Sequence, residues 1–111
     1  MKLHRRFEWD RKKAGLNIRR HDLSFDNAAL VLGQEDGEVY LIEEYDDEHS
    51  HKEDRYRTFG SHPQDRIIVL CISWTQREDN KGSITRIISA RFATPRERKE
   101  YVGQIQKRTR A

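Results

Sequence analysis

Arginine residues recur inside two segments whose alternation of polar and apolar side chains predicts β-strands. Arg55 and Arg57 are two residues apart and therefore project from one face, whereas Arg86 and Arg91 are five apart and would lie on opposite faces of a regular strand. The planar guanidinium group matches phosphate oxygens and stays charged at any useful pH. These arginines are therefore candidates for gripping a phosphodiester. The alternative for each is a salt bridge, to an acidic loop or to Glu97.

Two further side chains could move protons at such a site. His21 ends the first predicted helix and Tyr101 lies in the last one. Either side chain can donate a proton to an oxygen that leaves phosphorus. Together with Arg55, Arg86 and Arg91 they make up our candidate catalytic set.

A metal site is the competing interpretation of the histidine-containing loop. His49 and His51 could bind a metal ion together with Asp46 or Asp47. The loop has no standard ligand spacing, so a solvated turn is the better interpretation. We therefore expect neither a metal nor another cofactor.

Composition fits one small domain spanning residues 1–111. The chain has 34% hydrophobic and 37% charged residues, and its only cysteine, Cys71, lies in the most apolar segment as a small hydrophobe. No apolar segment approaches the ~18 residues of a membrane span, and the N-terminus lacks the apolar part of a signal peptide. We therefore expect a cytoplasmic protein with no membrane partner.

Charge is unevenly distributed along the chain. Residues 1–21 carry a net charge of +6, residues 22–54 of −11, and residues 55–111 of +8. If the two basic segments meet in space, they form a field suited to a polyanion, while the acidic segment frames that site or faces a basic partner. The alternative is that all these charges form an ordinary solvated surface.

The pattern of apolar residues predicts an α+β domain with a mainly antiparallel sheet, two N-terminal helices and one C-terminal helix. We expect helices at about 11–20, 25–32 and 95–107 and strands at about 6–9, 38–43, 55–59, 67–74 and 85–91. Asp10, Ser24 and Thr94 are placed to cap the helices, and Gly33 to stop the second. Segments 60–65 and 79–82 supply turns. The strand at 67–74 is apolar on both faces, which is typical of a strand covered above and below.

Four segments occur in this order along nearly the whole chain: Phe7-Glu8-Trp9-Asp10, Asp47-Glu48-His49-Ser50, Phe59-Gly60 and Arg86-Ile87-Ile88-Ser89-Ala90-Arg91. Together they resemble the BrnT toxins of bacterial toxin-antitoxin pairs. It implies a RelE-like ribonuclease fold and cleavage of RNA that arrests translation. It also implies neutralisation by a BrnA antitoxin. The ribbon-helix-helix part of that antitoxin would bind promoter DNA, and the toxin would contact DNA only through the antitoxin.

Three further basic residues could contact RNA: Lys13 and Arg77 by the resemblance, and Arg57 by its place beside Arg55 on one strand face. Arg57, Arg77 and Lys13 are the RNA-binding candidates, whereas Trp74 is an individual feature of this chain. Residues 102–111 lie beyond the resemblance and could form a disordered basic tail.

Two classes of function remain open. The first is a metal-independent endoribonuclease, in which the RNA 2′-hydroxyl attacks the adjacent phosphate. The second is a nucleic-acid-binding module without catalysis, for which the basic ends suffice. Cleavage of RNA in EDTA would favour the enzyme, and intact but bound RNA the binding module.

Overall fold

The computed structural model describes residues 5–34 and 40–110. Five strands form one sheet in the order β1-β5-β4-β3-β2. Strands β2 to β5 pair antiparallel with their sequence neighbours, and β1 pairs parallel with β5. The predicted α+β class with a mainly antiparallel sheet is therefore confirmed. The strands are β1 (Phe7–Glu8), β2 (Leu41–Tyr45), β3 (Arg55–His62), β4 (Asp65–Asp79) and β5 (Gly82–Phe92).

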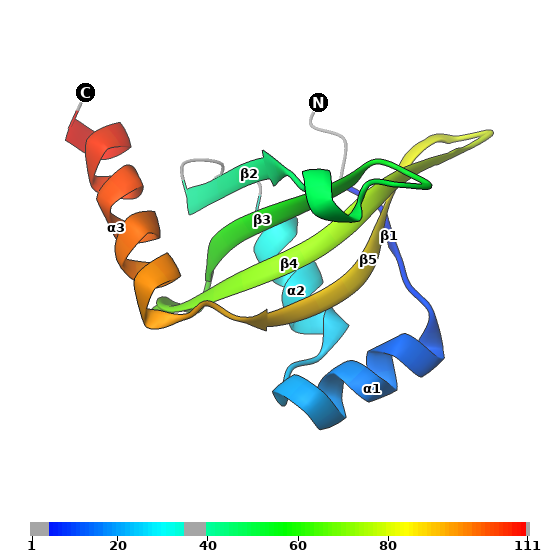
Figure 1. The fold of residues 1–111 in the computed structure, drawn as a ribbon, viewed down its shortest axis with the longest axis horizontal. Coiled ribbons are helices and arrows are strands. Elements are labelled where there is room, and N and C mark those ends of the chain that lie inside the picture. Colours follow the sequence, from blue (N-terminus) through cyan, green and yellow to red (C-terminus); the bar gives the residue numbers. More distant parts are fainter. Residues whose placement is uncertain (1–4, 35–39, 111) are drawn as a thin grey trace.

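Three helices surround this sheet (Figure 1). Helix α2 packs behind it against β3, β4 and β5, and α1 lies along β5. Helix α3 stands at the opposite end of the sheet from β1. No described helix is long and apolar enough to cross a membrane. The helices are α1 (Arg11–His21), α2 (Phe25–Leu32) and α3 (Pro95–Arg110), and a 3-10 turn, η2 (Asp47–His49), follows β2.

The helices begin where the polar capping residues predict. The Asp10 carboxylate accepts hydrogen bonds from the Lys12 and Lys13 amides, and the Ser24 hydroxyl accepts one from the amide of Asn27. The Glu97 carboxylate accepts from the Thr94 amide while the Thr94 hydroxyl accepts from the Glu97 amide, which completes a capping box. Gly33 caps the end of α2 as predicted.

Several predicted boundaries were wrong. Residues 60–62 belong to β3 rather than to a turn, so the chain reverses over residues 63–64 alone. Strand β2 begins at Leu41 and runs to Tyr45, and Glu38 and Val39 of its predicted start lie outside the described residues. Helix α3 extends past Lys107 to Arg110, so residues 102–110 are helical, and the Arg108 guanidinium donates to the carbonyl of Leu41.

The core lies between α2 and one face of the sheet. Strand β4 contributes Leu70 and Ile72 to this core, and β5 contributes Ile87 and Ala90. Strand β4 is buried on both faces, as predicted, because Cys71 on the face away from the core is only 3% exposed. On that face, Cys71 is paired in register with Phe59 of β3 and Arg91 of β5. Arginine side chains therefore lie on this second covered face.

A buried asparagine fixes α1 to the edge of the sheet. The Asn17 side chain accepts from the Ala90 amide at 3.0 Å and donates to the Ala90 carbonyl at 2.8 Å. It thereby hydrogen-bonds to β5 as a neighbouring strand would. A second N–H of its amide donates to the Leu23 carbonyl. The amide thus holds the backbone next to Arg91.

Trp74 belongs to the core face of the sheet. Its ring stacks on Tyr56 with a centroid distance of 4.7 Å, and its indole N–H donates to the Thr58 hydroxyl. The Arg5 guanidinium lies 4.7 Å from the Trp74 ring. Trp74, the individual feature of this sequence, is therefore a packing residue that is 5% exposed.

Gly60 is the glycine at which the fold is most sensitive to a side chain. A Cβ atom there would lie 2.7 Å from Val31 of α2 and 2.7 Å from Leu41 of β2. We expect Gly60→Ala to lower the free energy of unfolding by about 1–3 kcal/mol, the usual cost of overpacking a core. Gly15→Ala is the matched control, because a Cβ there meets nothing within 4 Å and alanine favours the helix by about 0.5–1 kcal/mol. Denaturant titration distinguishes the two, and an unchanged stability of Gly60→Ala would contradict the packing.

Candidate active site

A β-bulge places the two separated arginines of β5 on one face. Ser73 pairs with Ser89, but Trp74 pairs with Ile87, which leaves one extra residue in β5. The extra residue reverses the alternation of faces. Arg91 therefore pairs with Cys71 and Arg86 with Thr75, two residues on the same face of β4. The expectation of opposite faces, which holds for a regular strand, was wrong.

A groove of about 240 Å³ lies on this face of the sheet, and Arg91 and Cys71 are among the residues that line it. Strand β3 contributes Arg55 and Arg57, and β5 contributes Arg91, so three of the predicted arginines meet there. The loop containing η2 closes one side of the groove. The complete lining is Asp46, His49, Arg55, Arg57, Cys71, Ser73, Ile88, Ser89 and Arg91.

Two of the groove arginines form salt bridges with carboxylates that do not line the groove. Arg57 donates to Glu44 of β2 at 2.7 Å, and Arg91 donates to both oxygens of Glu97 at 2.7 and 3.0 Å. The salt-bridge alternative is therefore present, and it fixes the guanidinium groups at the groove. Side chains held in one position lose less conformational entropy when they bind a ligand.

Arg55 is held more loosely. Its guanidinium lies 3.5 Å from the carboxylate of Glu53 in the acidic loop. The Nε atoms of Arg55 and Arg57 are buried and have no hydrogen-bond partner in the described part of the chain. An unsatisfied buried donor costs about 1–3 kcal/mol, so an acceptor that reaches these groups gains binding energy from them.

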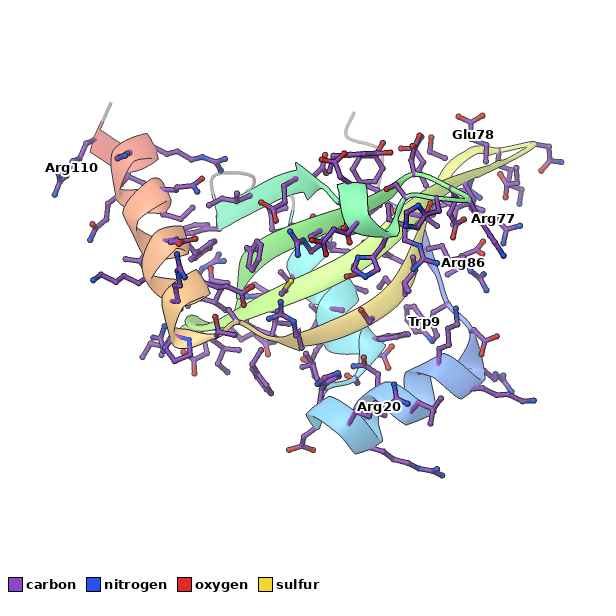
Figure 2. The ribbon with its side chains drawn as sticks, in the orientation of Figure 1. Trp9, Arg20, Arg77, Glu78, Arg86 and Arg110 are labelled. Atoms are coloured by element: carbon purple, nitrogen blue, oxygen red, sulfur yellow. The ribbon has the colours of Figure 1, made fainter. Side chains whose placement is uncertain are left out.

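Arg86 and Arg77 form a neighbouring pair outside the groove lining. Both donate to the carboxylate of Glu8 on β1, Arg77 at 3.3 Å. Figure 2 shows both arginines toward the β1 end of the sheet, above Trp9. The basic surface therefore continues from the groove along β4 and β5.

Hydrogen bonds and burial shift several pKa values at the groove. The guanidinium of Arg91 and the amide of Thr94 lower the pKa of Glu97 to about 2, and Glu97 in turn raises the pKa of Arg91. Burial raises the pKa of the Cys71 thiol to about 11. Cys71 is therefore an uncharged thiol at neutral pH, which agrees with its interpretation as a small hydrophobe.

The ion pair of Arg91 and Glu97 should make part of the free energy of unfolding sensitive to acid. A carboxylate with a lowered pKa stabilises the fold above its unfolded pKa, and this stability is lost as the pH falls through the folded value. For Glu97 that window runs from about pH 5 to about pH 2. We expect the unfolding free energy of Glu97→Gln to fall less steeply than that of wild type over this window. Equal slopes in denaturant titrations at each pH would contradict this prediction.

The η2 loop carries an aspartate and histidine pair at the rim of the groove. The Asp46 side chain is buried, and its two oxygens lie 2.9 and 3.1 Å from Nδ1 of His49. Burial works to raise the pKa of Asp46, but the hydrogen bond and charge of His49 outweigh it and lower the pKa. Within residues 5–34 and 40–110, no group of three potential metal ligands is found.

Besides Arg77 and Arg86, three more predicted site residues lie outside the groove lining. Tyr101 is 5% exposed, and its hydroxyl donates to the Tyr40 carbonyl and accepts from the Ser61 amide. These bonds dock α3 on the sheet. His21 ends α1 half-buried, and Lys13 is exposed on the same helix.

Sequence reasoning missed His49 as a groove residue. The sequence pattern indicates only a candidate metal ligand at this position, because an acidic loop ordinarily stays in solvent. The available signal was its position three residues after Asp46, a spacing that lets the two side chains meet across one helical turn.

The fold and the groove define a small α+β protein with a cationic surface suited to a polyanion. Residues 9–97 match the family described as ribonuclease toxin, BrnT, of type II toxin-antitoxin system. Because this match spans most of the chain, the protein belongs to that family, and the resemblance inferred from the sequence is confirmed. It is thus a ribonuclease toxin with an RNA target and an antitoxin partner. No curated protein matched the chain.

Proposed function

We propose that the groove cleaves RNA without a metal ion. The observation that carries the proposal is the convergence of Arg55, Arg57 and Arg91 on one groove of about 240 Å³. Three guanidinium groups can surround a single phosphate and neutralise the charge that develops on its oxygens during reaction. Arginine can thereby replace the cation that many nucleases use.

The reaction is an intramolecular transfer at phosphorus. The RNA 2′-oxygen attacks the adjacent phosphate, and the bond from phosphorus to the 5′-oxygen breaks. The products are a 2′,3′-cyclic phosphate and a 5′-hydroxyl. Positioning the 2′-oxygen in line with the leaving oxygen supplies part of the rate enhancement, and guanidinium groups supply another part.

The remaining candidates take supporting roles in this proposal. Arg86 and Arg77 would bind a neighbouring phosphate, because they lie together on the extension of the basic surface. Lys13 would contribute to the field of the first basic segment. Tyr101 would hold α3, and with it Glu97, in place for Arg91, because its hydroxyl is occupied by two backbone groups.

We further propose that the partner is a BrnA-like antitoxin with a ribbon-helix-helix part that binds promoter DNA. The membership in a toxin-antitoxin family supports an antitoxin partner. The toxin itself would contact DNA only through this partner. Cleavage of RNA would take place in the cytoplasm and would inhibit translation.

RNA cleavage in EDTA tests the proposed reaction. We expect the purified protein to cleave RNA at the same rate with and without EDTA and to leave 2′,3′-cyclic phosphate ends. Loss of cleavage in EDTA with recovery on adding a divalent ion would contradict metal independence. RNA that is bound but remains intact in either buffer would favour the non-catalytic binding module.

A further inference from the structure

The groove contains a histidine, His49, that is paired with Asp46 and that has no role in phosphate binding by the arginines. His49 lines the groove together with Arg55, Arg57 and Arg91. Its side chain is 62% exposed, whereas the Asp46 side chain beneath it is 8% exposed. One ring nitrogen is therefore held by a buried carboxylate while the rest of the ring is open to an incoming ligand.

The hydrogen bond to Asp46 determines which nitrogen carries the proton. A carboxylate accepts hydrogen bonds, so Nδ1 of His49 carries the N–H and donates it to Asp46. In the neutral ring Nε2 then has a lone pair. No partner for Nε2 is found among residues 5–34 and 40–110. The ring can therefore take a proton at Nε2, and Asp46 stabilises the imidazolium that results.

We propose that His49 is the general base for RNA cleavage in this groove and that Asp46 is its positioning residue. This inference rests on the proposed ribonuclease function. Nε2 takes the proton from the 2′-hydroxyl as the bond between the 2′-oxygen and phosphorus forms. The 5′-oxygen leaves and takes a proton from water, and the imidazolium neutralises the resulting hydroxide.

The surroundings of His49 supply the other charges of this step. Arg55 and Arg57 face the groove from β3 and Arg91 from β5, so guanidinium groups are available for the phosphate. Cys71 of β4 also lines the groove, but burial raises the pKa of its thiol to about 11, which keeps it uncharged. Asp46 is the carboxylate in direct contact with the ring.

The test compares His49→Ala with His51→Ala. His51 is an exposed histidine in the same loop and is absent from the groove lining, so it controls for loop charge and composition. We expect His49→Ala to bind a 2′-O-methyl RNA within about 3-fold of wild type but to cleave RNA about 10²- to 10⁴-fold more slowly, the usual loss on removing a general base. His51→Ala should match wild type in both measurements.

Two readouts distinguish a base from a merely structural residue. Wild-type cleavage should decrease toward acidic pH because a protonated base cannot accept the 2′-hydroxyl proton, and this decrease should be absent from the residual activity of His49→Ala. Added imidazole should restore part of the activity of His49→Ala. Asp46→Asn should slow cleavage by about 10-fold or more with RNA binding retained, because the orientation of the ring is lost.

The outcomes separate the inference from the function on which it rests. If wild type cleaves RNA and His49→Ala cleaves it at the same rate with the same pH profile, the inference is overturned and the ribonuclease function stands. If His49→Ala is slow, lacks the pH dependence and responds to imidazole, the inference is supported. A wild-type protein that cleaves no RNA overturns both.

Discussion

Replacing Arg57 and Arg91 together by alanine is expected to lower RNA cleavage at least 100-fold and to abolish growth inhibition. Both side chains line the groove, and each is held there by a carboxylate. A hydrogen bond to a charged group contributes roughly 1.5–3 kcal/mol, so the loss of two such contacts, about 3–6 kcal/mol, exceeds a factor of 10². Cleavage rates of the purified proteins and growth at matched protein levels measure the effect.

The matched control removes two arginines elsewhere. Arg19 is exposed on α1, and Arg110 lies at the far end of α3 (Figure 2). Their double alanine variant has the same net charge as the groove variant and should keep most of the activity. Circular dichroism verifies that the groove variant is folded, and a glutamine version at positions 57 and 91 avoids leaving the partner carboxylates without a hydrogen bond. Equal activity of the groove variant and the control would contradict the site assignment.

Co-expression with the neighbouring antitoxin gene is expected to yield a copurifying complex without ribonuclease activity. The groove arginines already bind carboxylates of this chain, Glu44 and Glu97, so an acidic segment of the partner can bind the same guanidinium groups. Opposite charge also speeds capture. A segment that folds on binding would bury an interface of roughly 1,200–2,000 Å² or more. RNA and antitoxin would then compete for the groove.

Competition gives this prediction a sharper form. Excess antitoxin should displace labelled 2′-O-methyl RNA from the toxin, and the variant lacking Arg57 and Arg91 should bind both ligands more weakly. A ternary complex of toxin, antitoxin and RNA would contradict inhibition by competition. Free and fully active toxin recovered from the co-expression would contradict inhibition altogether.

Local chemistry made the helices predictable. Capping depends on residues close in sequence, so Asp10, Ser24 and Thr94 marked the three helix starts correctly. The shared face of Arg55 and Arg57 followed from simple alternation along a strand. These features need no knowledge of distant contacts.

The parts that were missed depend on distant contacts. The bulge in β5 arises from its pairing with β4, and alternation along one strand cannot reveal it. Gly60 suggested a turn, but the close approach of Val31 and Leu41 requires a glycine within β3. The position of His49 at the groove depends on where the acidic loop folds back over the sheet, and Tyr101 is occupied by backbone groups far away in sequence.

The most direct test of the groove as the RNA site is an NMR titration with a short 2′-O-methyl RNA, which binds but cannot be cleaved by attack of its 2′-oxygen. The account predicts that the largest shifts occur at the backbone amides of Arg55, Arg57, Cys71 and Arg91 and at the His49 ring, with the amides of α2 on the opposite face unaffected. Shifts concentrated on α2 and on the Arg5 and Trp74 end of the core face, with none at the groove, would contradict it.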